Sequence, residues 1–191
     1  MGVRVEWPPV FHVNMRDPDN TELFWSIDPA TGAGKCVEYG HAETHSGSHF
    51  FIKDYQDVSA GTLDFLFITP DTTKWAHALW FFAGEGEFNL DLYIDATVSA
   101  NGTGITPINR NGNSGTAATV AAYSGPTVST TGTKIWGAKF GAGRTAGGLI
   151  RENSEYIGEQ NTIYLFRATK VGAGTLWLDY LFDWYEHTNK F

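Results

Sequence analysis

Apolar and polar residues alternate most clearly near the end of the chain, in two runs separated by a short segment with two glycines. The first run covers residues 161–169 and the second covers residues 175–188, and both are rich in aromatic and β-branched residues. Lys170 to Gly174 lies between them. Alternating runs joined by a short glycine-containing segment are typical of β-hairpins. We therefore expect residues 161–188 to form a β-hairpin with a longer loop.

The second run predicts a strand with two different faces, because side chains of a strand point alternately to opposite sides of the sheet. One face is wholly apolar: Leu176, Leu178, Tyr180, Phe182 and Trp184. The other face is mixed: Trp177, Asp179, Leu181, Asp183 and Tyr185. The apolar face should be buried against a second sheet, since no helix is predicted nearby. The mixed face is typical of a sheet surface partly covered by another strand, an arm or another subunit.

Residues 49–160 contain further short alternating segments separated by turn formers. The predicted strands are residues 50–55, 62–69, 75–83, 88–95, 105–108, 116–124, 133–140 and 148–151, with a glycine-rich loop at residues 141–148. Many short strands without an intervening helical period predict an antiparallel sandwich or barrel. Its interior is expected to contain Leu178, Tyr180, Phe182, Phe65, Phe67 and Leu165.

Residues 1–48 carry few strand signals and are predicted to form an extended arm ahead of a β-sandwich domain at residues 49–191. The sequence Trp7-Pro8-Pro9 favours an extended backbone. Its main apolar segment, residues 23–27, needs a surface to lie on, either the body of the same chain or a neighbouring molecule.

Composition narrows the classes of partner. The 191 residues carry a formal net charge of −8, which disfavours nucleic acid because phosphate binding requires clustered Lys and Arg. The single cysteine, Cys36, fits assembly in a reducing cytoplasm. We find no apolar run of about 18 residues and no signal-peptide pattern, so a membrane is not expected as a partner.

Histidine and aspartate spacings suggest metal ligands only weakly. His41, His45 and His49 recur every four residues, which on a helix would present three imidazoles to zinc or nickel. The Ser-Gly-Ser at residues 46–48 disfavours a helix, so a solvated loop leading into a strand is the preferred interpretation. Asp91 and Asp95 would suit calcium, but they do not match an EF-hand or RTX spacing. We expect no metal and no cofactor.

Catalytic groups are equally weak in the sequence. Glu85 and Glu87 flank a glycine in a predicted loop, whereas a glycosidase pair needs a controlled separation on rigid strands. Asp179, Asp183 and His187 lack the Gly-x-Ser-x-Gly elbow that a serine hydrolase needs. The sequence therefore predicts a binding or structural protein and not an enzyme.

Several segments together resemble a known group of proteins. They are residues 45–50, 95–103, 107–114, 161–165 and 183–188, of which the Asn-Arg-Asn-Gly-Asn-Ser loop at 109–114 and the Trp-Tyr-Glu-His at 184–187 are the most specific. Over about residues 40–190 the chain resembles virion proteins of tailed bacteriophages of the jelly-roll kind. The resemblance implies an all-β antiparallel β-sandwich of jelly-roll type, here with an extended N-terminal arm.

The resemblance also implies a role. Such proteins look like capsid decoration, or cement, proteins, which bind the lattice of the major capsid protein on the outer surface of the virion after synthesis in the host cytoplasm. We expect a homotrimer at local three-fold positions, because contacts to three capsid subunits at once strengthen binding through effective concentration.

The expected contact residues fall into three groups. The capsid-contact residues of the arm are Trp7, Leu23, Phe24, Trp25 and Ile27. The subunit interface is expected at Trp177, Asp179, Leu181, Asp183 and Tyr185. The exposed loop contains Asn109, Arg110, Asn111 and Asn113.

The alternative is a glycan- or receptor-binding jelly-roll module of a phage tail fibre or baseplate. In that hypothesis Trp75, Trp80, Trp136 or Trp177 stacks on sugar rings, although core packing is the more ordinary role of tryptophan. A groove with two exposed tryptophans flanked by Asn or Asp would favour glycan binding.

Overall fold

The computed structural model describes residues 15–16, 22–23, 39–59, 61–141, 144–148 and 155–188. The chain divides into two compact units, residues 1–38 with 190–191, and residues 39–189. In the first unit, β1 (Met15–Arg16) pairs with β2 (Glu22–Leu23) in antiparallel register. Among the described residues, the helix and all other strands belong to the second unit. This unit begins ahead of residue 49, where the sequence places the start of the sandwich.

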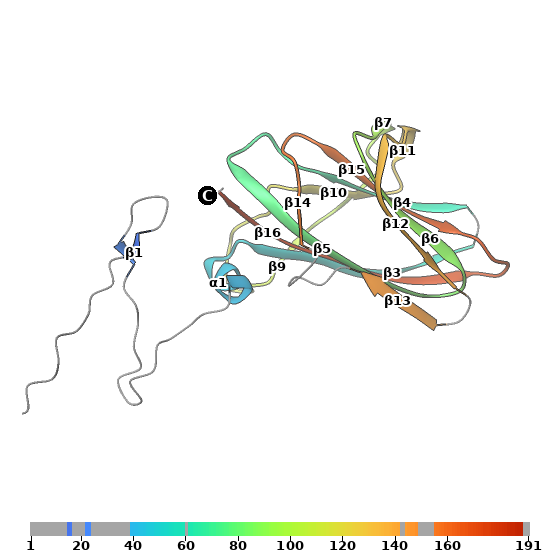
Figure 1. Ribbon diagram of the computed structural model, residues 1–191, viewed down its shortest axis with the longest axis horizontal. Coiled ribbons are helices and arrows are strands. Elements are labelled where there is room, and N and C mark those ends of the chain that lie inside the picture. The colour runs from blue at the N-terminus through green and yellow to red at the C-terminus, as the bar shows by residue number, and fades with distance from the viewer. Residues whose placement is uncertain are drawn as a thin grey trace, which may run out of the picture. The chain divides into compact units, whose positions relative to one another are not determined.

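The second unit is an antiparallel β-sandwich, as the sequence predicted, and its two layers are visible in Figure 1. Sheet 1 has the order β13 (Arg144–Gly148), β5 (Lys74–Glu85), β16 (Leu176–Thr188), β3 (His49–Val58) and β9 (Ile108–Asn109), with β14 (Tyr156–Ile157) also paired to β5. Sheet 2 has the order β12 (Thr133–Phe140), β6 (Phe88–Ile94), β15 (Ile163–Lys170), β4 (Thr62–Ile68), β10 (Ala121–Ser124) and β8 (Thr103–Ile105).

The predicted hairpin at the end of the chain is wrong. β15 pairs with β4 and β6 in sheet 2, whereas β16 pairs with β3 and β5 in sheet 1. The two strands are therefore consecutive in the chain but belong to different layers of the sandwich. Hydrophobic alternation and a short loop are the same for two strands paired edge to edge and for two strands packed face to face, so the pattern did not distinguish them.

The main core lies between the two sheets. Leu178, Tyr180 and Phe182 of β16 and Phe65 and Phe67 of β4 are all buried in it, as predicted. Aromatic rings fill much of this space, for example Phe65 against Tyr180 with centroids 4.4 Å apart. The apolar face of β16 that the sequence indicated therefore lines one side of the core.

A second, smaller core lies on the other side of sheet 2. Leu165 is fully buried, but it packs with Leu66 and Ala96 in this separate cluster and not between the sheets. Val98 of β7 (Thr97–Ala100) and Val128 of β11 (Thr127–Thr130) cover the cluster, and Figure 1 shows these strands on the outer side of sheet 2. The expected burial of Leu165 is correct, while the expected side of the sheet is not.

Two local predictions are also corrected. Tyr39–Ser46 form an α-helix, α1, where a loop was expected. Gly47 has a φ of 78°, and the bonds from Gly47 N to Thr44 O (3.2 Å) and from Ser48 N to Glu43 O (3.1 Å) form a Schellman cap. The Ser-Gly-Ser segment therefore ends a helix and does not prevent one. The predicted loop at residues 141–148 contains β13, which pairs with β5 at the edge of sheet 1.

Candidate functional site

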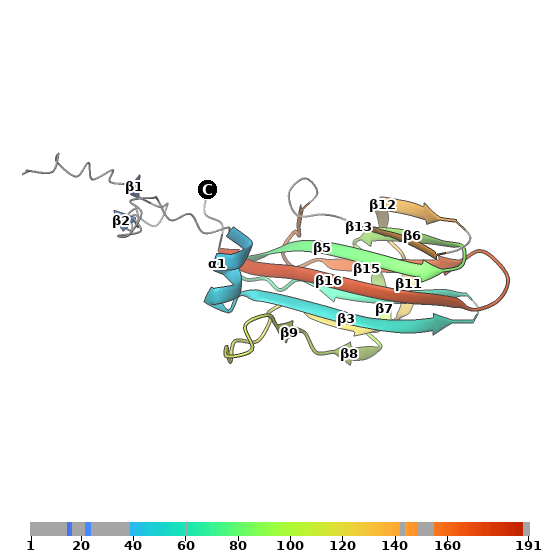
Figure 2. The same ribbon diagram turned by 90° about the horizontal axis from the view of Figure 1, so that it is seen from below.

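The outer face of sheet 1 carries the largest exposed aromatic side chains of the described residues. β16 lies between β3 and β5, and Figure 2 shows the three strands side by side. The register places residues in three rows across these strands: Asp57, Trp177 and Glu85, then Tyr55, Asp179 and Ala83, then Lys53, Leu181 and Phe81. Directly opposed residues of antiparallel strands point to the same side. We call these nine residues the Trp177 face.

The Trp177 face combines exposed rings with exposed carboxylates. Tyr55 is 75% exposed, Trp177 61% and Phe81 43%. The side chains of Asp57 and Glu85 occupy the positions on either side of Trp177, and Asp179 follows two residues along the same strand. An exposed apolar surface that is interrupted by charges is typical of a binding surface.

At the other end of β16, side chains of a polar network around Asp183 cover the same outer face. His49 Nε2 lies 2.5 Å from Asp183 Oδ1, and Arg110 Nη2 pairs with Asp183 Oδ2. Thr44 Oγ1 of α1 lies 2.9 Å from His49 Nδ1. The guanidinium of Arg110 also lies over the ring of Phe51, 5.0 Å from its centroid. The loop after β9 is therefore held against the sheet by its arginine.

Burial and charge act in opposite directions on Asp183. Burial raises the pKa of its carboxyl, but the hydrogen bond from His49 and the charges of His49 and Arg110 lower the pKa more, and the result lies below the ordinary value of 3.8. The carboxylate is thus stabilised in its ionised form by partners from two distant parts of the chain.

Asparagine side chains fold the loop onto the helix cap. Asn109 Nδ2 donates to Gly47 O (2.8 Å) and Thr116 O (3.1 Å), and Asn109 Oδ1 accepts from Asn111 N (2.9 Å). Asn111 Nδ2 donates to His45 O (3.2 Å). Three segments of the resemblance, at residues 45–50, 107–114 and 183–188, therefore meet in one hydrogen-bonded network. Asn113, whose N–H donates to Asn111 Oδ1, is exposed.

This network changes the interpretation of two predicted interface residues. Asp183 and Tyr185 are only 8% and 3% exposed, because groups of the same chain cover them. The hydroxyl of Tyr185 donates to Glu155 Oε2 (2.8 Å), and its ring stacks on His77. Trp177, Asp179 and Leu181 remain at the open end of the face. The predicted interface is thus divided into an open part and a part that the chain itself closes.

Most of the predicted contact residues of the arm lie outside the described residues. Trp7, Phe24, Trp25 and Ile27 lie outside the described residues, and Leu23 is placed only as a backbone position in β2.

The groups considered for metal binding do not converge. On α1, His45 Nε2 lies 3.0 Å from His41 Nε2, whereas His49 lies on β3 and contacts Thr44 and Asp183. Asp91 pairs with Lys134 on the outer face of sheet 2. Within residues 39–59, 61–141, 144–148 and 155–188, no group of three or more His, Cys, Asp or Glu side chains is arranged to hold a metal ion.

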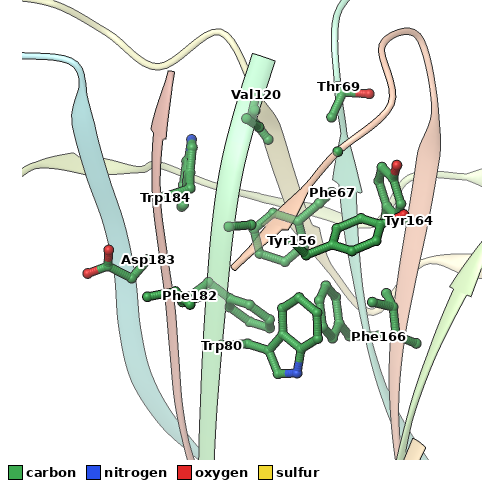
Figure 3. Close-up of a pocket in the computed structure, with 15 residues that line it drawn as sticks. Phe67, Thr69, Trp80, Val120, Tyr156, Tyr164, Phe166, Phe182, Asp183 and Trp184 are labelled. Atoms are coloured by element: carbon green, nitrogen blue, oxygen red, sulfur yellow. The ribbon is translucent and has the colours of Figure 1, made fainter. Parts of the chain in front are cut away.

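The space between the sheets contains a cavity of about 50 Å³, shown in Figure 3. Its walls include Trp80, Tyr156 and Phe166, and the carboxylate of Asp183 points away from it. Sites for small molecules usually measure about 300–1,000 Å³ and contain convergent polar groups. This cavity is therefore a small packing gap in an aromatic core.

Sheet 2 presents a different outer surface. Arg167 donates to both carboxylate oxygens of Asp64, at 2.8 and 2.7 Å, on the neighbouring strand. Asp91 lies opposite Arg167 on the other side and pairs with Lys134 of β12. Charges of opposite sign therefore neutralise each other across four strands. The aromatic surface with exposed carboxylates is a property of sheet 1.

Comparison with known protein families, with curated proteins and with solved structures finds no match to this chain. No helix in the described part of the chain is long and apolar enough to cross a membrane. The candidate site is therefore defined by its own geometry.

Sequence analysis did not identify Tyr55, Phe81 or Asp57 as members of the site, and it considered Glu85 only as a catalytic group. These residues come from β3 and β5, and their places beside Trp177 follow from the register of the sheet. The alternation within each strand shows which residues share a face, but it does not show which strands are neighbours.

Proposed function

We propose that this protein is a structural virion protein of a tailed bacteriophage that decorates the capsid by binding the major capsid protein. The observation that carries the proposal is the Trp177 face, where Tyr55, Trp177 and Phe81 are exposed to solvent on a well-formed sheet. An ordered aromatic surface of this kind suits attachment to another protein, because aromatic side chains contribute much of the energy of protein interfaces. The sequence resemblance to jelly-roll virion proteins supplies the identity of the partner.

The strand order supports the jelly-roll type. Consecutive strands pass from one sheet to the other in the pairs β3–β4, β5–β6, β12–β13 and β15–β16. The last pair returns to lie between the first two, with β16 between β3 and β5 and β15 between β4 and β6. This wrapping of paired strands is the arrangement expected of a jelly roll. The segment from β7 to β11 is then an insertion that extends both sheets and covers the outer core.

A homotrimer at local three-fold positions of the capsid remains part of the proposal. Three copies would engage three capsid subunits together, and individually weak contacts would gain roughly 10² to 10⁴ in avidity. The open residues Trp177, Asp179 and Leu181 are available for such contacts, while Asp183 and Tyr185 serve the fold of their own chain.

Co-sedimentation with purified empty capsids of the virus that encodes this chain tests the proposal. We expect the protein to pellet with the capsids at a fixed number of copies, and mass photometry of the free protein to show a trimer. The double variant Tyr55→Ala/Trp177→Ala should lose occupancy. The control Ile135→Ala, an exposed apolar residue on β12 of the opposite sheet, should retain it. Absence of the wild-type protein from the pellet would refute the proposal.

The glycan-binding alternative has one observation in its favour, the exposure of Trp177 beside carboxylates. Of the other three candidates, Trp80 is buried in the main core, and Trp75 and Trp136 are half-buried. The two exposed tryptophans in one groove that a glycan site was expected to need are not found among the described residues. We therefore prefer a protein partner.

A further inference from the structure

We propose that the Trp177 face binds arginine or lysine side chains of its protein partner, with the cationic group over the indole of Trp177 and close to the carboxylates of Asp57, Asp179 and Glu85. This inference rests on the proposed function for the identity of the partner and adds the chemistry by which that partner is held.

The first argument is the position of the indole. Trp177 lies directly between Asp57 of β3 and Glu85 of β5 in the register of sheet 1. Side chains in directly opposed positions have Cβ atoms about 4.5–5.5 Å apart. A guanidinium or ammonium group within about 6 Å of the ring centroid is attracted by the negative face of the ring. Such a group would also lie within reach of the two flanking carboxylates.

The second argument is that the described part of the chain provides no ion-pair partner for these carboxylates. The chain forms internal ion pairs at Asp64, Asp91 and Asp183. The described residues show no comparable bond to Asp57, Asp179 or Glu85, although all three are exposed on one small surface. Their negative charge is therefore available to a ligand.

The third argument is charge balance. The Trp177 face holds three carboxylates and one cation, Lys53, which lies two rows away from Trp177. Arg144 of β13 occupies the register position on the far side of Glu85, whereas Asp57 and Asp179 lie on strands that do not pair with β13. The whole chain has a formal charge of −8. A partner with clustered Arg or Lys is complementary to this surface.

Charge also favours an Arg- or Lys-bearing segment over two other occupants, a second copy of this chain and an oligosaccharide. A second copy applied face to face would oppose carboxylates with carboxylates, which disfavours a symmetric dimer through this surface. A neutral oligosaccharide could stack on Trp177 and donate hydroxyl hydrogen bonds to the carboxylates, but it would not neutralise their charge. An Arg- or Lys-bearing segment uses both the ring and the charges, and arginine uses them best because its planar group stacks and pairs at the same time.

Titration of the full-length protein with a capped peptide of four Gly-Arg repeats tests the inference. The readout is the ¹⁵N–¹H signal of the Trp177 indole, assigned by its loss in Trp177→Phe. We expect this signal to shift on addition of the peptide at low salt. The affinity, measured by isothermal titration calorimetry because Trp177→Ala lacks this signal, should fall roughly threefold to tenfold in Trp177→Ala and in Asp57→Asn/Asp179→Asn. These positions are exposed, so circular dichroism should show an unchanged fold.

The matched control is Asp71→Asn/Glu159→Gln, which removes the same two charges from exposed loops away from the face. We expect it to bind the Arg peptide like the wild type. Equal weakening in both double variants would mean unspecific charge attraction and would overturn the inference. It would also be overturned if the Trp177 signal responded to chitohexaose but not to the Arg peptide, or to neither.

The two proposals fail separately. Loss of peptide binding with intact attachment to capsids overturns only the cation-binding inference. Peptide binding at Trp177 without attachment to capsids overturns the proposed function and leaves a cation-binding face whose partner is a different protein.

Discussion

The imidazole of His49 and the carboxylate of Asp183 are joined by a contact of 2.5 Å between atoms whose residues lie 134 positions apart in the chain. The contact links the first long strand of the sandwich to the last, and Arg110 joins it from the loop after β9. It therefore fixes the loop and the helix end to the sheet at one point.

Asp183→Asn should destabilise the fold by roughly 3 kcal/mol, because it removes a buried carboxylate, 8% exposed, that pairs with Arg110 and contacts His49. Asp71→Asn, at an exposed position, should change stability by less than about 0.5 kcal/mol. Urea unfolding at pH 7 measures both. An Asp183→Asn variant as stable as the wild type would show that the network contributes nothing to the free energy of unfolding.

The same carboxyl predicts a dependence on pH. The pKa of Asp183 in the folded chain lies below its ordinary value of 3.8, so its contribution is complete above about pH 4 and is lost as the pH falls through the folded-state pKa. We expect the difference in unfolding free energy between the wild type and Asp183→Asn to shrink as the pH falls below about 4. A difference that grew on acidification would contradict this assignment.

Glu186→Gln tests a second buried carboxylate. Glu186 is 2% exposed and accepts hydrogen bonds from Thr119 N, Thr119 Oγ1, Val120 N and Trp184 Nε1, at 2.6 to 3.0 Å. A glutamine would place an amide donor against these donors, which should cost roughly 2 kcal/mol. Faster amide exchange at Val120 is the local readout. Glu159→Gln, an exposed control, should leave both the stability and this exchange rate unchanged.

Gly132→Ala tests the turn between β11 and β12. Gly132 has a φ of 77°, and a Cβ there would meet the carbonyl oxygen of Ile94. We expect a loss of more than about 2 kcal/mol, from backbone strain together with the collision. Gly125 has a φ of 63° but open space around it, so Gly125→Ala should cost only about 1 kcal/mol. Thermal unfolding of the two variants separates the effect of the collision from that of backbone strain. An equal loss of stability in both would show that the collision at Gly132 adds nothing.

Deletion of residues 1–30 tests the proposed arm. We expect weaker attachment to capsids and an unchanged circular dichroism signature of the sandwich, which belongs to residues 39–189. Co-sedimentation measures the attachment. Full occupancy on capsids without these residues would remove the arm from the proposed interface.

The pattern of apolar and polar residues predicted many of the strands correctly. The parity of β16 indicated correctly that Leu178, Tyr180 and Phe182 are buried and that Trp177 and Asp179 are not, because alternation is a property of a single strand. The prediction of a loop around Ser46-Gly47-Ser48 was wrong, because a glycine that ends a helix cannot be distinguished by sequence from one that prevents a helix. Only the bonds of the helix cap distinguish the two.

The sequence was enough to predict a β-sandwich with an aromatic core for the second unit, because the period, the turn residues and the apolar face of each strand are properties of short segments. Long-range packing places β15 and β16 in different sheets and turns Leu165 toward the second core. It also buries Asp183 while leaving Trp177 exposed. Each of these depends on a partner strand or loop that is distant in the chain. Pairing between distant strands is selected by the packing of the whole domain, which no single segment contains.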